Sequence, residues 1–437
     1  MYLSKNKIFQ FIFFLLITKF AIFNGGNSNL QIQINFIILC TFFLVCTLNK
    51  NYIANLKFFL NSNKISILFF ILFLIYLIFQ FSPIPVGILK YLSPEKYKIL
   101  LNLPNDTSLN TISFHPSDTY FQMINFLSLF LIVLVMKMIF QNNRHKRRFY
   151  IYVSFLGACF SLIAVLFYLS GNPDFFIIKN STDLSSATGF FVNRTVFSVF
   201  LLFCLIGSFE LLKLKNEKES NSLFFLKIYI RLFVIIISIG IITSFSRIGN
   251  FLFICTIIYF LVNCIFVDKE KNKSFINLLI IFIIFDVIIL GYYFGFTHLI
   301  ERFYFLKDEL TISNEEFIRI NIIEFGFKQL KDFVLFGYGA GSFEIIFQLK
   351  YENLTNLYAD HSHSDLIEFL GEFGLIGFIF ISIPLLHFFF NKENITHTSI
   401  ILIFYSLIIL MFDFSLHIPI IQIFFIIFFI LNKKIFS

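Results

Sequence analysis

Long apolar runs alternate with short polar segments along almost the whole chain. Many runs approach or exceed the roughly 18 apolar residues that a helix needs to cross the hydrocarbon core of a bilayer. Such runs lie near residues 8–24, 30–48, 65–82, 119–140, 150–169, 195–212, 226–244, 250–267, 275–296, 375–390, 398–412 and 416–432. The pattern predicts an all-α polytopic membrane protein with about twelve transmembrane helices.

Composition argues against two other fold classes. Hydrophobic residues make up 58% of the 437 positions, which is more apolar surface than the interior of a soluble domain hides. A membrane β-barrel would instead show short segments of alternating hydrophobicity. The six cysteines all lie within apolar segments and show no metal-ligand spacing, so we expect neither disulfides nor a zinc site.

The formal net charge is +8, and the basic residues lie in short loops between apolar runs, such as 142–148 and 213–220. This distribution is typical of loops retained in the cytoplasm rather than of a nucleic-acid-binding surface. We therefore expect membrane lipids, and no nucleic acid, as partners. With a cytoplasmic N-terminus, the longer loops that lie outside are 83–118, 170–194 and 297–374, and the short connection between the seventh and eighth spans also lies outside.

The stretch HSHSDLIEFLGEFGLIG, residues 361–377, gathers scarce polar residues at the end of the longest outer loop. A histidine at the boundary between membrane and water titrates near neutrality, so it can accept a proton from a hydroxyl group. The alternative is a polar helix start, with Ser362 or Ser364 as the N-cap and acidic residues in the first turn.

Three arginines also fall on the expected outer side. Arg194 follows Asn193 at the mouth of the sixth span, Arg247 separates the seventh and eighth spans, and Arg319 lies in the long outer loop. An ionisable residue at membrane depth indicates a functional site, unless its side chain snorkels to the surface. For Arg194, the alternative is a plain helix entry capped by Asn193.

Taken together, the arginines and the histidine indicate an anionic ligand. Guanidinium forks match phosphate oxygens in pairs, and they stabilise negative charge that develops on a diphosphate leaving group. A lipid-linked diphosphate reaches this depth with its tail in the bilayer.

These stretches, in their order along the chain, resemble the O-antigen ligase and O-antigen polymerase superfamily of bacterial envelope glycosyltransferases. The histidine stretch resembles the family's His-Asn-Asp-Tyr-Leu signature and places His363 on its key histidine. TGFFVNRTVFSVF and SFSRIG resemble two further elements and place Arg194 and Arg247. Two more stretches match family elements, namely GYGAGSF at 337–343 and FDFSLHIPI at 412–420. By itself, the glycine stretch lacks the spacing and lysine of a phosphate loop, so a plain turn is an equal interpretation.

The resemblance implies a C-type glycosyltransferase-like bundle in the bacterial inner membrane, with the active site facing the periplasm. It implies an inverting, metal-independent transfer without a cofactor, from a glycan on undecaprenyl diphosphate to a hydroxyl of lipid A–core or of a lipid-linked glycan. In this interpretation His363 and Arg247 are catalytic, and Arg194, Arg247 and Arg319 bind the diphosphate. The expected supporting residues are His361, Asn193, Ser246, Asp365 and Glu372.

The resemblance also suggests a division of the chain. We expect N-terminal transmembrane helices in 1–186, a ligase-like catalytic core in 187–420 that includes the periplasmic loop 297–374, and the end of the last span with a cytoplasmic tail in 421–437.

A ligase or a polymerase is the first interpretation, and two alternatives remain open at this point. A polymerase and a protein-directed O-oligosaccharyltransferase share the chemistry of a ligase and differ from it in the acceptor. A lipid-linked oligosaccharide flippase is the non-enzymatic alternative. A flippase would place ionisable residues at the midplane of several helices, whereas here they gather at the outer mouth.

Overall fold

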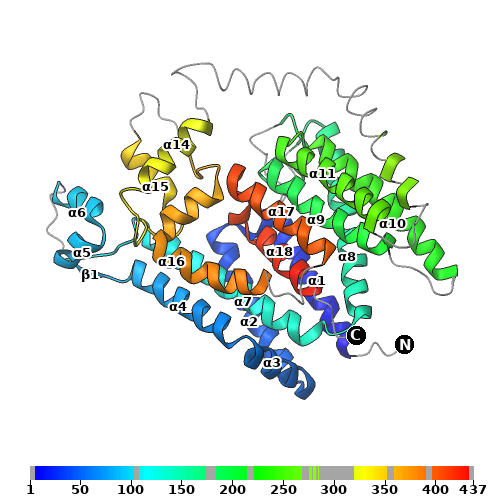
Figure 1. The fold of residues 1–437 in the computed structure, drawn as a ribbon, viewed down its shortest axis with the longest axis horizontal. Coiled ribbons are helices and arrows are strands. Elements are labelled where there is room, and N and C mark those ends of the chain that lie inside the picture. Colours follow the sequence, from blue (N-terminus) through cyan, green and yellow to red (C-terminus); the bar gives the residue numbers. More distant parts are fainter. Residues whose placement is uncertain are drawn as a thin grey trace. The chain divides into compact units, whose positions relative to one another are not determined.

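The computed structural model describes residues 5–102, 108–173, 184–213, 221–267, 319–351, 359–389 and 396–432, with scattered positions between 275 and 284. These residues are almost entirely helical (Figure 1). The strands β1 (Ile84–Pro85) and β2 (Leu109–Asn110) pair as a short antiparallel ribbon. The chain divides into two compact units, of which unit 1 contains residues 1–26, 140–315 and 435–437, and unit 2 contains 27–139 and 316–434.

Eight helices in the described ranges are long and apolar enough to cross a membrane. They are α2 (Asn29–Thr47), α4 (Lys64–Phe81), α7 (Pro116–Ile139), α8 (Asn143–Leu169), α9 (Arg194–Lys213), α10 (Asn221–Thr243), α11 (Arg247–Val262) and α16 (Asp365–Phe389). Three further apolar helices lie at other expected spans, namely α1 (Lys5–Ile22), α17 (His397–Phe412) and α18 (Pro419–Asn432). The predicted all-α polytopic membrane fold is therefore confirmed, while most of the expected span 275–296 lies outside the described residues.

Unit 1 is built around α9, which is the most deeply buried of the candidate spans and has almost all of its side chains inside the structure. Helices α8, α10 and α11 pack on it, and α1 packs on α8. Short irregular helices extend two of these elements, η1 (Asn24–Gly26) after α1 and η2 (Asn263–Val267) after α11. The apolar sequence of α9 continues around the whole helix, which explains why it lies at the centre of unit 1 rather than on its surface.

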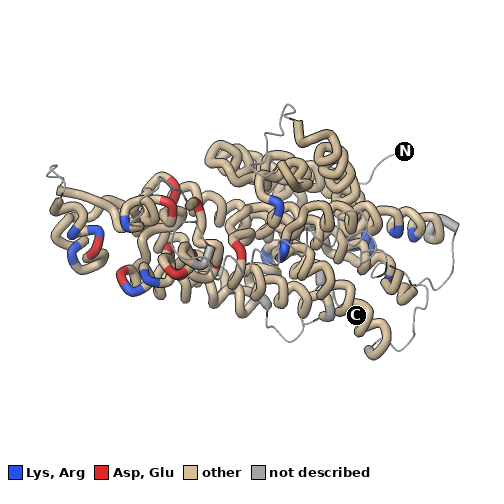
Figure 2. Tube along the Cα trace, turned by 90° about the horizontal axis from the view of Figure 1, so that it is seen from above, with Lys and Arg blue, Asp and Glu red and all other residues tan. Residues whose placement is uncertain are grey.

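Unit 2 combines long apolar helices with shorter helices, most of which lie in segments that were expected to be loops. Among the apolar helices, α7 packs against α2, α4 and α18, and α16 packs against α4 and α17. The shorter helices are α3 (Lys50–Ser62), α5 (Val86–Leu92), α6 (Pro94–Leu101), α14 (Arg319–Gln329), α15 (Phe343–Lys350) and η4 (Ser415–His417), of which η4 overlaps the start of the expected span 416–432. Acidic residues gather at the end of unit 2 that holds α6, α14, α15 and the start of α16 (Figure 2).

Helix α16 begins at Asp365, directly after Ser364, with Asp365 and Glu368 in its first turn, so the polar helix start expected there is present and the helix precedes the apolar span 375–390 by ten residues. The helix bends at Gly374, whose φ is 59°. At the bend, the N–H of Leu375 donates to the carbonyl of Val334 at 2.8 Å, and the Tyr76 hydroxyl donates to the carbonyl of Phe373 at 2.7 Å. Because these partners satisfy the backbone groups that the bend releases, the helix continues through it.

The expected division at residues 186 and 420 was drawn from sequence elements, whereas the two units are defined by packing. The division therefore stays a prediction. What the fold adds is that the two candidate regions fall in different units, since Arg194 and Arg247 belong to unit 1 and the histidine stretch belongs to unit 2.

Candidate functional site

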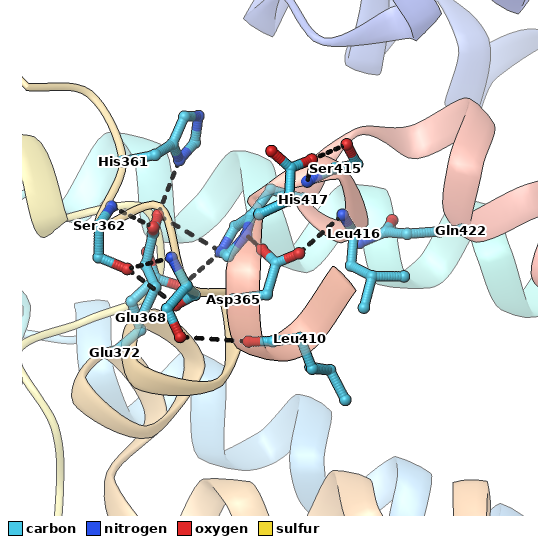
Figure 3. A network of polar contacts seen from close by, with 12 residues as sticks. His361, Ser362, Asp365, Glu368, Glu372, Leu410, Ser415, Leu416, His417 and Gln422 are labelled. Atoms are coloured by element: carbon cyan, nitrogen blue, oxygen red, sulfur yellow. Dashed lines mark hydrogen bonds and ion pairs between the residues drawn. The ribbon is translucent and has the colours of Figure 1, made fainter. Parts of the chain in front are cut away.

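Three carboxylates lie buried on one face of the first two turns of α16. Asp365, Glu368 and Glu372 are 0%, 1% and 1% exposed. Their spacing of three and four residues brings them to the same side of the helix. Figure 3 shows that their carboxyl groups converge on the imidazole of His417, which the short helix η4 carries and which is 5% exposed.

The first two carboxylates each hold a backbone N–H with one oxygen and face His417 with the other. Asp365 Oδ2 accepts from the N–H of Leu416 at 2.8 Å, and its Oδ1 contacts Nδ1 of His417. Glu368 Oε2 accepts from the N–H of Ser362 at 2.8 Å, and its Oε1 lies 3.5 Å from His417 Nε2. A buried carboxylate is stable only with hydrogen bonds and a counter-charge, and this arrangement supplies both.

Glu372 repeats the arrangement one turn further along α16. Its Oε1 accepts from the N–H of Gly341 at 2.7 Å, and its Oε2 lies 3.6 Å from Nε2 of His417. Gly341 belongs to the glycine turn, residues 337–341, in which the N–H of Gly339 also donates to the carbonyl of Glu372 at 3.1 Å. The glycine turn therefore directs these backbone donors at α16, and its glycines allow the close approach.

Two further histidines flank the cluster on the segment before α16. Nδ1 of His361 lies 2.8 Å from Glu368 Oε1, and its ring stacks on Phe414 at 4.5 Å between centroids. His363 packs edge-on to the same phenylalanine at 5.5 Å and is partly exposed. Its φ of 58° lies in the left-handed region, which an ordinary residue adopts only when its neighbours impose it.

The two histidines that face carboxylates, His361 and His417, both have raised pKa values. Burial lowers the pKa of His417, but the charges of Glu368 and Asp365 and the hydrogen bond to Asp365 outweigh burial and hold it well above the ordinary value. For His361, burial again acts downward, and the charge and hydrogen bond of Glu368 raise its pKa overall. Both raised pKa values favour the imidazolium form of these histidines beside the carboxyl groups of α16.

His361, Glu368 and His417 also have the residue types of a metal site, with one ligand atom from each lying within 4.8 Å of the others. The contact between His361 and Glu368 is nevertheless of hydrogen-bond length, at 2.8 Å. The geometry is explained by paired imidazolium and carboxylate groups. The expected absence of a metal stays a prediction.

In unit 1, Arg194 and Arg247 are the first residues of α9 and α11. Asn193 caps α9, because its Oδ1 accepts from the N–H of Thr195 at 2.7 Å. Ser246 caps α11 by accepting from the N–H of Gly249 at 3.1 Å, and its hydroxyl also donates to Oγ1 of Thr195 at 3.2 Å. The two helix starts are thus joined directly beside both arginines, which are partly exposed.

The predicted site residues form two groups. Arg194, Arg247, Asn193 and Ser246 come together in unit 1, and His361, His363, Asp365 and Glu372 come together in unit 2. Arg319 begins α14 in unit 2, and its side chain lies outside the described part of the chain. A site that unites both groups stays a prediction.

Sequence reasoning did not select His417 or Glu368, although the structure places both at the centre of the unit 2 cluster. A signal for them was present. Three acidic residues within eight positions of an apolar helix require a buried cation, and His417 is the histidine of the apolar stretch 412–420. What the sequence did not give was the pairing itself, which joins residues 52 positions apart.

The fold and these two groups define a polytopic membrane protein that carries paired arginines at helix starts and a buried histidine–carboxylate cluster. Residues 232–382 match the family described as O-antigen ligase, which places this part of the chain in the O-antigen ligase and polymerase superfamily. The resemblance drawn from the sequence is therefore confirmed. The matched segment includes Arg247 and His363, whereas Arg194 precedes it and His417 follows it. No curated protein matches the chain.

Proposed function

We propose that the protein transfers a glycan from undecaprenyl diphosphate to an acceptor sugar hydroxyl at the periplasmic face of the bacterial inner membrane. The observation that carries this proposal is the O-antigen ligase match over residues 232–382, because the matched segment holds both Arg247 and His363. Activity of the ligase and polymerase type follows from the family, while the donor, the acceptor and the side of the membrane are our proposal.

The arginine group suits the diphosphate of the donor. Arg194 and Arg247 extend from two helix starts that Ser246 and Thr195 join. Guanidinium groups bind phosphate oxygens in pairs, and the N-terminal ends of helices favour anions. As the bond between the sugar C1 and the diphosphate oxygen breaks, charge develops on the leaving group, and both effects then become stronger. Arg319 is the third proposed ligand.

His363 suits the acceptor. In this proposal its imidazole removes the proton of the acceptor hydroxyl while the hydroxyl oxygen bonds to C1 of the donor sugar. Undecaprenyl diphosphate leaves with the electron pair of the broken C1–O bond. Attack from the face opposite the leaving group inverts the anomeric centre, and the step requires no metal and no cofactor. The partial exposure of His363 supports this role.

The flippase alternative has less support. It requires ionisable residues along the middle of several helices. The buried acidic residues Asp365, Glu368 and Glu372 instead lie in the first turns of one helix, where histidine and backbone N–H groups compensate them.

Deleting the gene and comparing envelope glycans on a gel tests the proposal and identifies the acceptor. A ligase predicts loss of long chains from lipid A–core with accumulation of lipid-linked polymer. A polymerase predicts core capped with a single repeat. A protein-directed transferase predicts unchanged lipid A–core and loss of protein-linked glycan. Unchanged glycans in all three fractions would contradict the proposal.

A further inference from the structure

We infer that His417 is a positioning residue: a buried imidazolium that holds the segment carrying His363 against α16 and the glycine turn. The inference rests on the proposed function for its link to catalysis. It adds a residue that lies beyond the end of the O-antigen ligase match at residue 382.

The first step is the protonation state of the imidazole. Both ring nitrogens of His417 face carboxylates, Nδ1 towards Asp365 and Nε2 towards Glu368 and Glu372 at 3.5 and 3.6 Å. A neutral imidazole has a lone pair on one nitrogen, which would repel the carboxylate that it faces. An N–H on each nitrogen removes this repulsion, so the geometry points to an imidazolium that bonds Asp365 through Nδ1 and lies at ion-pair distance from both glutamates through Nε2. The ring also stacks on Phe369 at 4.1 Å between centroids, which fixes its plane.

The second step is charge balance. The cluster buries three carboxylates, and the cationic side chains that face them are His417 and His361. A buried carboxylate without a counter-charge is strongly unfavourable. Removal of the His417 charge would leave three carboxylates to share one imidazolium, and the carboxyl groups of Glu368 and Glu372 would move apart or bind protons.

The third step links the carboxylates to His363. The Glu368 carboxylate that faces His417 also holds the N–H of Ser362, the residue before His363. The Ser362 hydroxyl then donates to the carbonyl of Ser364, the residue after it, at 2.8 Å. Both serines are buried, at 0% and 3% exposed. Movement of Glu368 therefore releases both neighbours that keep His363 in its left-handed conformation.

A second set of contacts joins the start of α16 and the segment before it to the end of α17 and the residues that precede η4. The N–H of Asp365 donates to the carbonyl of Asp413 at 2.9 Å, and the Ser364 hydroxyl donates to the carbonyl of Leu410 at 3.2 Å. Phe414, between these residues and His417, packs on the ring of His363. The C-terminal segment 410–417 thus forms one wall of the environment of His363, and His417 anchors that wall to α16.

The test begins with hydrogen–deuterium exchange on the purified full-length chain, because this readout does not depend on the reaction. His417→Gln is expected to accelerate exchange in peptides covering Ser362, Gly341 and Leu416 by about tenfold or more. The matched control is His387→Gln, which removes an exposed histidine near the other end of α16. Unchanged exchange in the His417→Gln protein would overturn the inference.

The second part is a double-mutant cycle on glycan transfer with His363→Ala. If His417 acts by positioning His363, His417→Gln lowers kcat, leaves KM for the lipid-linked donor unchanged, and adds little loss once His363 is absent. Fully additive losses would overturn the inference. If exchange rises in His417→Gln but His363→Ala transfers glycan normally, the proposed function fails and the positioning of the segment stands.

Charge balance provides a rescue that separates this role from simple misfolding. Glu372→Gln in the His417→Gln background removes the surplus carboxylate, so the double variant is expected to recover slow exchange and part of the transfer rate. No recovery would count against the inference. Metal analysis of the purified protein tests whether His361, Glu368 and His417 instead bind a metal ion. One ion per chain in the wild type, lost in His417→Gln, would make His417 a metal ligand and would overturn the inference.

Discussion

The two candidate regions of this protein stabilise their polar residues in opposite ways. In unit 1, a serine hydroxyl and an asparagine amide cap the helix starts beside Arg194 and Arg247, and a bond between hydroxyl groups joins them. In unit 2, buried charges of opposite sign surround His417. In unit 1 the capped helix starts place two guanidinium groups near one another in the chain's fold, whereas in unit 2 a compensated ion cluster holds a segment in place. In our proposal the first region binds the diphosphate, and the second holds His363.

The largest expected effect is that of His363→Ala, which removes the proposed base. Loss of a general base typically costs about 10²–10⁴-fold in rate, so kcat for glycan transfer should fall by that order while the protein stays folded. The measurement is transfer from purified lipid-linked donor, with His387→Ala as the control. A rate within twofold of wild type would show that His363 is not the base.

Arg247→Ala should produce the next largest loss, about 10²–10³-fold in kcat/KM, because the developing charge on the diphosphate loses a preorganised donor. Arg247→Lys should restore only part of the activity, since an ammonium group lacks the paired geometry of guanidinium. Arg144→Ala, an exposed arginine of α8, is the control. Full activity of the lysine variant would show that charge alone suffices and that paired recognition is not used.

A smaller expected effect is a difference between the two regions in how their contribution to stability depends on pH. The folded-state pKa of His417 is raised above its ordinary value of 6.5 by carboxylates that outweigh burial. A raised folded-state pKa contributes stability that is fully present below the unfolded value and is lost as pH rises through the folded value. The groups that face His417 are Asp365, Glu368, Glu372 and, ring to ring, His361.

Thermal unfolding of wild type and His417→Gln between about pH 6 and pH 10 checks this sign. The stability advantage of the wild type should shrink towards alkaline pH. A stability difference between wild type and His417→Gln that is constant or grows with pH would contradict a charged His417. Ser246→Ala, in the region that neutral groups stabilise, should lower the melting temperature equally at both ends of the range.

Ser246→Ala is expected to have the smallest effect. Loss of an N-cap side chain costs about 1 kcal/mol, so unfolding should shift by a few degrees, with a modest loss of activity because α11 still begins at Arg247. Ser406→Ala, whose hydroxyl donates to the carbonyl of Ile403 within α17, is the matched control. A loss of kcat/KM as large as that of Arg247→Ala would mean that the hydrogen bond between Ser246 and Thr195 does more than cap α11.

The lengths of the apolar runs predicted most of the fold, because a membrane helix is recognised from its own continuous apolar sequence. The polar helix start expected after Ser362 or Ser364 is present, since α16 begins at Asp365. The apolar span alone begins ten residues later, because Asp365, Glu368 and Glu372 count as polar although the structure buries all three. The sequence pattern grouped His361, Asp365 and Glu372 correctly, since they lie within one short stretch. It missed His417, because an ion pair between residues 52 positions apart leaves no periodic trace.

The most direct test of the central claim is the stoichiometry of the reaction in proteoliposomes that contain the purified full-length protein, a lipid-linked glycan donor and its acceptor. The proposal predicts release of one undecaprenyl diphosphate for each glycosidic bond formed, with both products falling together in His363→Ala and in Arg247→Ala. Movement of the donor across the bilayer without release of undecaprenyl diphosphate, or unchanged product formation in both variants, would contradict it.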